Sequence, residues 1–416
     1  MRYSLLDYLA CPVCHDDLLC IVSDEIPSAM PPGLFPDGKR VSAGPGVGPA
    51  PAWPRGGPLA GLLARAAAAP ANPERGREVE VASGLLICGS CGRWFPIEGT
   101  IPELLPDHLR DATRERPLFE AAARGLTSEL RQALEAFQPT GDAQADPGAH
   151  YKKAEIGIKT KIADPIFFGP GLTSPFNPWN SSFTTYLISL FGTVLPFLEL
   201  ERSHVVLDSG CGYSWSTEWL FRSGYDAIGV DICRTYLEIA VQRLGTFRPH
   251  LVVGDVENLP LQNGIANAVL AYESFHHIPD RNRALAEYYR VMGRSGRVIL
   301  AEPGSAHEKA EVAVDAMAKF GILEKGMDLS DVVGYTAGSG FSPPEQLFFF
   351  STSSSERKAR MSREFAQRHT TLHNNIFRLT KGSPMTLALA HSPLSRRSPI
   401  GRVLRRARSA LRLGAR

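Results

Sequence analysis

Residues 204–214 have the sequence HVVLDSGCGYS, an apolar run that ends at an acid and passes into a glycine-rich loop. The pattern after the loop, at 215–223, is that of a helix. Glycines at such a point let the backbone turn sharply and approach a ligand without a Cβ clash. The stretch therefore predicts a strand, a ligand-binding turn and the start of a helix.

The same alternation of strand and helix patterns continues along the chain. Strands are expected at 204–208, 227–231, 251–253, 266–273 and 297–302, with closing strands at 347–351 and 376–380, and helices at 215–223, 235–244, 284–292 and 308–319. This order indicates an α/β fold, a doubly wound and mostly parallel Rossmann-like sheet that helices cover on both faces. The ligand crevice of such a sheet lies at the carboxyl ends of its strands.

Acids stand at three of these strand ends, and they bear on which nucleotide the crevice binds. Asp231 ends the second strand, 19 residues after Gly212, where a carboxylate accepts hydrogen bonds from ribose hydroxyls. A dinucleotide fingerprint needs a small third residue, and Trp215 stands there instead. Asp208 suits the ammonium of a methionine moiety, and Asp255 follows the third strand, where an adenine edge would lie. The pattern therefore favours S-adenosylmethionine over a dinucleotide.

The run 204–304 resembles the ubiquinone/menaquinone-biosynthesis-like branch of class I methyltransferases (methyltransferase type 11). The matching pieces are LDSGCG, GVDI, GDVENLPL, AYESFHHIPD and EYYRVMGRSGRVILAEPG, about a quarter of the chain. The resemblance implies that Asp208, Gly210 and Gly212 contact the methionine part, Asp231 the ribose and Asp255 the adenine amino group. The predicted cofactor-binding set is Asp208, Gly210, Cys211, Gly212, Asp231, Ile232, Asp255, Val256 and Tyr272.

Two histidines, His276 and His277, follow the fourth expected strand and are the candidate catalytic residues. Transfer of a methyl group to an oxygen or nitrogen that carries a proton needs a base, and either imidazole could take that proton. The alternative for each is an imidazole that packs or hydrogen-bonds within the loop. Tyr272 is expected to offer an aromatic face to the sulfonium.

The segment before the first strand of this sheet is rich in aromatic residues. Phe167, Phe168, Phe176, Trp179 and Phe183 are interleaved there with Gly and Pro. If the segment covers the crevice, its apolar character favours a small, fairly apolar methyl acceptor. The alternative is a packed extension with no part in substrate binding.

Four cysteines near the N-terminus form two pairs with two-residue spacing, Cys11 with Cys14 and Cys88 with Cys91. Each pair can direct two thiolates at one tetrahedral ion, and four thiolates leave no open position, so we expect a structural zinc ribbon. The sequence that follows, GRWFPIEGTIPELLP, resembles the zinc-ribbon activator subunits of tRNA, rRNA and release-factor methyltransferases.

Composition divides the chain further. We expect the ribbon at 1–106 with a Pro/Gly/Ala-rich flexible insertion at about 24–78, a helical linker at 107–149, the methyltransferase domain at 150–380 and a basic tail at 381–416. Because a linker is expected between the two domains, we expect the methyltransferase domain to stay folded when the metal is lost. Eight arginines lie between 396 and 416, where no acid occurs, so the rest of the chain is net acidic at −6 against a total of +2.

The tail is either a solvated segment or a basic amphipathic helix able to contact RNA phosphates or an anionic membrane surface. No stretch suggests a transmembrane span or a signal peptide, so we expect a cytoplasmic protein with reduced thiols. The predicted function is methyl transfer from S-adenosylmethionine to a small, apolar metabolite. The alternatives are an rRNA or tRNA base methyltransferase and a non-catalytic activator or scaffold.

Overall fold

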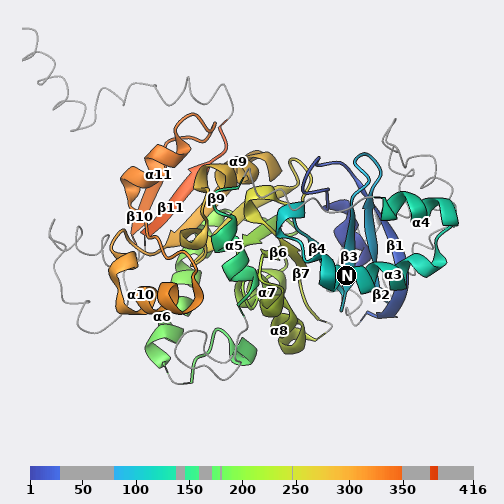
Figure 1. The fold of residues 1–416 in the computed structure, drawn as a ribbon. Coiled ribbons are helices and arrows are strands. Elements are labelled where there is room, and N and C mark those ends of the chain that lie inside the picture. The colour runs from blue at the N-terminus through green and yellow to red at the C-terminus, as the bar shows by residue number, and fades with distance from the viewer. Residues whose placement is uncertain are drawn as a thin grey trace, which may run out of the picture.

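The computed structural model describes residues 1–28, 79–136, 146–158, 171–178, 180–245, 247–348 and 375–382 (Figure 1). Three of the interpretations above concern residues outside these ranges. They are the insertion beyond residue 28, the aromatic residues Phe167, Phe168 and Trp179, and the basic tail beyond residue 382. These three stay predictions.

An 11-stranded sheet runs through the described residues, in the order β1-β2-β3-β4-β7-β6-β5-β8-β9-β11-β10 (Figure 1). Its second half is parallel from β7 to β9 and buried on both faces, which is why these strands are continuous apolar runs in the sequence. The strands are β5 (Val205–Ser209), β6 (Asp226–Asp231), β7 (His250–Gly254), β8 (Ala266–Tyr272) and β9 (Met292–Glu302), with β11 (Asn375–Thr380) and β10 (Glu345–Phe348) antiparallel at the edge. The predicted Rossmann-like fold class is confirmed.

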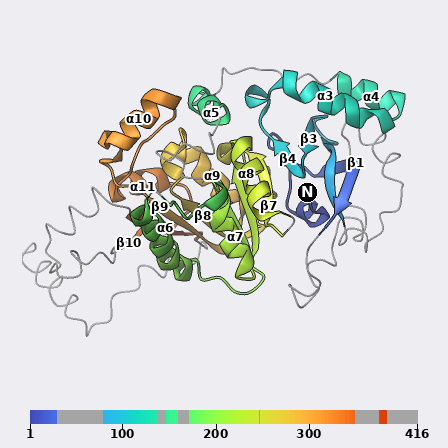
Figure 2. The ribbon, with the colours of Figure 1, turned by 90° about the horizontal axis from the view of Figure 1, so that it is seen from below.

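Helices cover both faces of this half. Side chains alternate along β5, so Leu207 joins the hydrophobic cluster on one face and Val206 the cluster on the other. The first face is covered by α9 (Arg281–Val291) and α11 (Leu329–Thr336), and the second by α6 (Ser181–Val194), α7 (Trp215–Arg222) and α8 (Arg234–Leu244). Figure 2 shows α6, α7 and α8 in front of the strands.

Helix α6 and the turn after it form an apolar segment that the sequence analysis did not identify. The segment Ser181–Leu198 has a mean hydropathy of 1.4 and is, by length and composition alone, apolar enough to cross a membrane. The expectation that no stretch of the chain is so apolar is therefore wrong. Leu190, Val194 and Leu198 are fully or almost fully buried against the sheet. Because 28% of the segment is buried, this packing accounts for only part of its apolar character.

The N-terminal half is an antiparallel meander. Its strands are β1 (Leu18–Pro27), β2 (Val79–Cys88), β3 (Trp94–Glu98) and β4 (Ile101–Leu104). Strand β1 continues to Pro27 and so extends past residue 24, near which the insertion is expected to begin.

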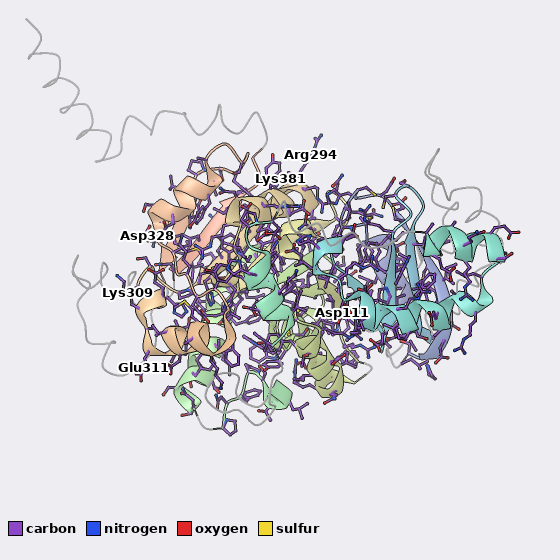
Figure 3. All side chains as sticks on the ribbon, viewed as in Figure 1. Asp111, Arg294, Lys309, Glu311, Asp328 and Lys381 are labelled. Atoms are coloured by element: carbon purple, nitrogen blue, oxygen red, sulfur yellow. The ribbon has the colours of Figure 1, made fainter. Side chains whose placement is uncertain are left out.

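Two helices cover this meander within the stretch that the sequence suggested as a linker. They are α3 (Ala112–Ala122) and α4 (Ser128–Glu135), and Phe119, Leu130 and Leu134 pack from them against β2. Asp111, labelled in Figure 3, caps α3 by accepting a hydrogen bond from the backbone N–H of Arg114 at 3.0 Å. These helices therefore belong to the N-terminal layer. The domain boundaries themselves stay predictions.

The two halves share one continuous sheet, because β4 pairs in parallel with β7. The register places Leu104 opposite Gly254, the last residue before Asp255. Beside it, the buried Arg248 guanidinium donates to Glu80 and Thr100 at 2.6 Å each, across the junction. The first ten residues also contact the second half, since the backbone N–H of Ala10 donates to the carbonyl of Pro260 at 2.9 Å. The expected separation of two modules by a linker is therefore not what the fold shows.

Candidate functional site

A cavity of about 280 Å³ lies at the carboxyl ends of β5, β6, β7 and β8. Its remaining walls come from α5 (Ala149–Ile156), on the N-terminal side of the sheet in sequence, and from α10 (Glu311–Phe320), on the C-terminal side. This is the crevice position that the strand order predicts for a doubly wound sheet.

The glycine loop forms the floor of the cavity. Gly210 and Gly212 have positive φ angles of 69° and 51°, which side chains rarely adopt. A Cβ at Gly210 would lie 2.6 Å from the Cβ of Ser274, so the loop could not approach the turn after β8 so closely with any other residue there. Both glycines line the cavity, and their contact with the methionine part of a cofactor stays a prediction.

Asp231 ends β6 and also lines the cavity. Its two oxygens accept backbone N–H bonds from Gly212 at 2.7 Å and Cys233 at 2.8 Å, so it fixes the loop from the neighbouring strand. Burial raises the pKa of its carboxyl to about 6. The predicted neighbour Ile232 lies on the same wall.

Three other members of the predicted cofactor-binding set lie behind the cavity lining. Asp208 is buried and accepts hydrogen bonds from the hydroxyls of Ser216 (2.7 Å) and Thr217 (2.5 Å) in the first turn of α7. The Tyr272 hydroxyl donates to the carbonyl of Leu187 at 2.8 Å, and its ring packs in the core. Cys211 is buried in the cluster under α8. The cofactor contacts assigned to these three side chains stay predictions. In the structure the side chains lie behind the residues that line the cavity.

At the other end of the crevice, Asp255 follows β7 and lines the cavity together with Val256. The Lys152 ammonium, from α5, donates to Asp255 at 3.0 Å, to Glu257 at 2.5 Å and to Asp146 at 2.9 Å. Burial opposes the charge of this lysine, but the carboxylates outweigh it and raise its pKa. One buried cation therefore holds three acids in place at this end.

His276 is held between two carboxylates. Its Nδ1 lies 2.7 Å from Glu302, which is fully buried, and its Nε2 lies 3.4 Å from Glu324. Although burial opposes protonation, the hydrogen bonds to these two acids raise the pKa of His276 to about 10. The imidazolium is therefore part of an ion cluster and does not line the cavity. The geometry favours a positioning role over that of a base.

His277 has the opposite protonation state and lines the cavity. Its Nδ1 donates to the carbonyl of Leu323 at 2.7 Å, which leaves the lone pair on Nε2. Burial and the charge of neighbouring His276 lower the pKa of His277 to about 3. Among the described residues, no hydrogen-bond partner holds Nε2, so it is placed to accept a proton.

The four cysteines of the N-terminal half come together on two tight turns. Cys11 Sγ lies 3.6 Å from Cys91 Sγ, and Cys14 Sγ lies 3.4 Å from Cys88 Sγ. All four sulfurs lie within 4.8 Å of one another. A tetrahedral zinc–thiolate site places its sulfurs about 3.8 Å apart, so the donor set fits zinc.

Comparison with known protein families now assigns both halves. Residues 207–300 match the family described as methyltransferase domain, and residues 2–99 match the family described as Trm112p-like protein. The chain joins a Trm112p-like domain to a methyltransferase domain. The cysteine cluster is the zinc site of the Trm112p-like domain, as predicted, and the cavity lies in the methyltransferase domain.

The chain is also similar to proteins that are named as methyltransferases. Methyltransferase GfsG of Streptomyces halstedii is 26% identical over 199 residues, which cover 46% of this chain and 69% of the relative. Phthiotriol/phenolphthiotriol dimycocerosates methyltransferase 1 of Mycobacterium ulcerans is 28% identical over 130 residues, 31% of this chain and 48% of the relative. Among solved structures, a Haloferax volcanii complex of the Trm112 methyltransferase activator and a putative methyltransferase matches 49% of this chain and 93% of its own, with 17% identity and a TM-score of 0.39.

Among the charged side chains that line the cavity, sequence reasoning missed five, namely Lys152, Glu155, Glu257, Glu273 and Glu324. Glu273 is the last residue of the expected fourth strand, so the rule that identified Asp231 and Asp255 could have found it. Lys152 and Glu155 stand on α5, more than fifty residues before the glycine loop, and no local pattern marks them.

Proposed function

We propose that the protein transfers a methyl group from S-adenosylmethionine to a small molecule, and that its Trm112p-like domain supports this activity within the same chain. The observation that carries the proposal is the convergence of the glycine loop, Asp231 and Asp255 at three neighbouring strand ends around one cavity. The pairing of β4 with β7 supports the second part, because it extends the methyltransferase sheet directly beside Asp255.

Bound S-adenosylmethionine would supply a methyl group already activated as a sulfonium, so the chain mainly has to orient and enclose the reactants. Gly210 and Gly212 allow the backbone to approach the ligand, and Asp231 offers remaining lone pairs to ribose hydroxyls. His277 Nε2 would receive the proton of an acceptor that carries one. His276, held as a cation, would keep the loop that carries His277 in place.

The variant His277→Asn is expected to lower kcat by roughly a hundredfold, the usual scale for a general base, and to leave S-adenosylmethionine affinity almost unchanged. Asparagine can still donate to the Leu323 carbonyl, so the loop should keep its position. Stopped assays for kcat and calorimetry for affinity give the two numbers. A fall in thermal stability that parallels the loss of activity would support a packing role instead.

The small-molecule assignment is supported by the apolar side chains on α10 that line the cavity, Val312, Ala316 and Phe320. An RNA substrate is the second candidate, resting on the arginines at 396–416, and a non-catalytic scaffold is the third. We also propose a cytoplasmic location, where the thiols at the zinc site stay reduced.

A labelled-methyl assay on bulk RNA, on protein and on a small-molecule extract separates these candidates. We expect label in the small-molecule pool, and deletion of residues 396–416 should leave turnover within about twofold, because a neutral or apolar acceptor gains little from the charge of an arginine-rich segment. Labelling of RNA alone, abolished by the same deletion, would establish the RNA alternative. Absence of label in every pool would favour the scaffold.

A further inference from the structure

The acceptor end of the cavity is the part beyond the glycine loop, between α5, the turn after β8 and α10. Three carboxylates reach it from separate elements: Glu155 from α5, Glu273 from the turn after β8 and Glu324 from the segment before α11. Nδ1 of His277 lies 3.5 Å from Glu155 and 3.9 Å from Glu324, so the acids surround the candidate base.

Two of these acidic residues have unusual surroundings. Glu273 has a strained backbone, and one oxygen of Glu155 is buried without a hydrogen-bond partner among the described residues. Glu273 has a φ of 53°, in the left-handed region, and accepts a hydrogen bond from the Tyr186 hydroxyl at 2.9 Å. Non-glycine residues in this conformation gather at functional sites, because the surroundings must enforce it. Oε1 of Glu155 is buried and has no hydrogen-bond partner within the described part of the chain, although Glu155 borders the cavity.

Most of the charged side chains along the cavity wall are acidic. Among the described residues that line it, the acids are Glu155, Asp231, Asp255, Glu257, Glu273 and Glu324, and the one cationic side chain is Lys152. That lysine is held by three acids at the Asp255 end. The acceptor end therefore offers an incoming ligand carboxylates and an imidazole lone pair, against the apolar wall of α10.

Burial raises the pKa values of two of these acids, and a bound cation would favour the loss of their protons to solvent. Burial raises the pKa of Glu155 to about 8, with Asp231 and Glu324 adding to the rise and His276 opposing it. It raises the pKa of Glu273 to about 7, against the pull of His276 and the Tyr186 hydrogen bond and with support from Glu302 and Glu324. A nearby cation would favour the ionised form of both.

We propose that the methyl acceptor is a primary or secondary amine on an apolar body, bound as its ammonium among Glu155, Glu273 and Glu324. The inference rests on the proposed methyltransferase function and specifies its substrate class. A carboxylate or phosphate on the acceptor would meet like charges here, whereas an ammonium would gain charge-assisted hydrogen bonds.

The chemistry balances with the groups present. His277 Nε2 takes one proton from the ammonium while its Nδ1 proton passes to the ionised Glu155, 3.5 Å away, whose pKa of about 8 makes it the stronger base. This transfer frees the nitrogen lone pair. That lone pair forms the new N–C bond to the methyl carbon while the C–S bond breaks, and its electron pair stays on sulfur to give neutral S-adenosylhomocysteine. The methylated ammonium leaves, and the proton on Glu155 passes to solvent.

The test uses the full-length protein saturated with S-adenosylhomocysteine and three matched probes: 2-phenylethylamine, 2-phenylethanol and phenylacetate. Calorimetry at pH 8 is expected to show the amine binding at least about tenfold more tightly than the alcohol, with phenylacetate weakest. Amine affinity should rise from pH 6 to pH 8, because the two glutamates ionise in this window while an alkyl amine, with a pKa near 10, stays protonated.

The variants Glu155→Gln and Glu273→Gln should each reduce the preference for the amine over the alcohol, and their melting temperatures report on folding. Glu311→Gln is the matched control, since Glu311 is exposed at the start of α10 and does not line the cavity (Figure 3). Equal affinities for amine and alcohol, tighter binding of phenylacetate, or binding of none of the probes would overturn the inference. Failure of S-adenosylhomocysteine and S-adenosylmethionine to bind would instead remove the proposed function, and the inference with it.

Discussion

Cys88→Ser is expected to abolish zinc binding and to destabilise both halves of the protein. Cys88 ends β2 and supplies one of four sulfurs, and a small ribbon cannot fold on apolar burial without its metal. The loss should spread because β4 would no longer be held against β7. It would also disturb the buried contact of Arg248 with Glu80, and an uncompensated buried charge costs several kcal/mol.

Elemental analysis measures the zinc content. The melting temperature and the affinity for S-adenosylmethionine measure how far the destabilisation spreads. Cys20→Ser is the matched control, since Cys20 lies on β1 outside the cluster and should keep one zinc per chain and the wild-type melting temperature within a few degrees. If zinc-free Cys88→Ser bound the cofactor with unchanged affinity and melting temperature, the halves would be independent, as the sequence had suggested.

That difference shows where sequence reasoning reached its limit on the fold. The strands of the methyltransferase sheet were predictable because they are buried on both faces and alternate with amphipathic helices. The junction was not, because only Glu103 and Leu104 pair with β7, and the four-residue strand that contains them includes Pro102. Whether so short a strand pairs depends on tertiary contacts such as Arg248 with Glu80, which are 168 residues apart.

Part of the site was predictable from the sequence, because its residues stand at the ends of parallel strands. The ends of parallel strands converge, so Asp231 and Asp255 were placed at the cavity by their position alone. Asp208 follows the same rule in sequence, but the hydroxyls of Ser216 and Thr217 hold its carboxylate behind the loop. A sequence shows which acids end strands, but not which of them a neighbouring hydroxyl will occupy.

Asp231→Ala should reduce S-adenosylmethionine affinity by a factor of at least ten, and we expect a larger loss than for any other single acid of the cavity. The carboxylate has two tasks. It presents oxygens to the ribose position, and it holds the glycine loop through the N–H groups of Gly212 and Cys233. Alanine removes the ribose contact and leaves two backbone donors without their acceptor, so the loop loses its preorganised shape.

The pH dependence of binding gives an independent check on the same group. Burial raises the pKa of Asp231 to about 6, and the ionised form is the better hydrogen-bond acceptor, so wild-type affinity should fall as the pH drops below 6. In Asp231→Ala this contribution should disappear. Calorimetry between pH 5 and 8 on both proteins, with Glu238→Ala on the exposed side of α8 as control, measures it. Unchanged affinity in Asp231→Ala, or tight binding of a nicotinamide dinucleotide by the wild type, would mean that the crevice holds a different nucleotide from the one its strand ends predict.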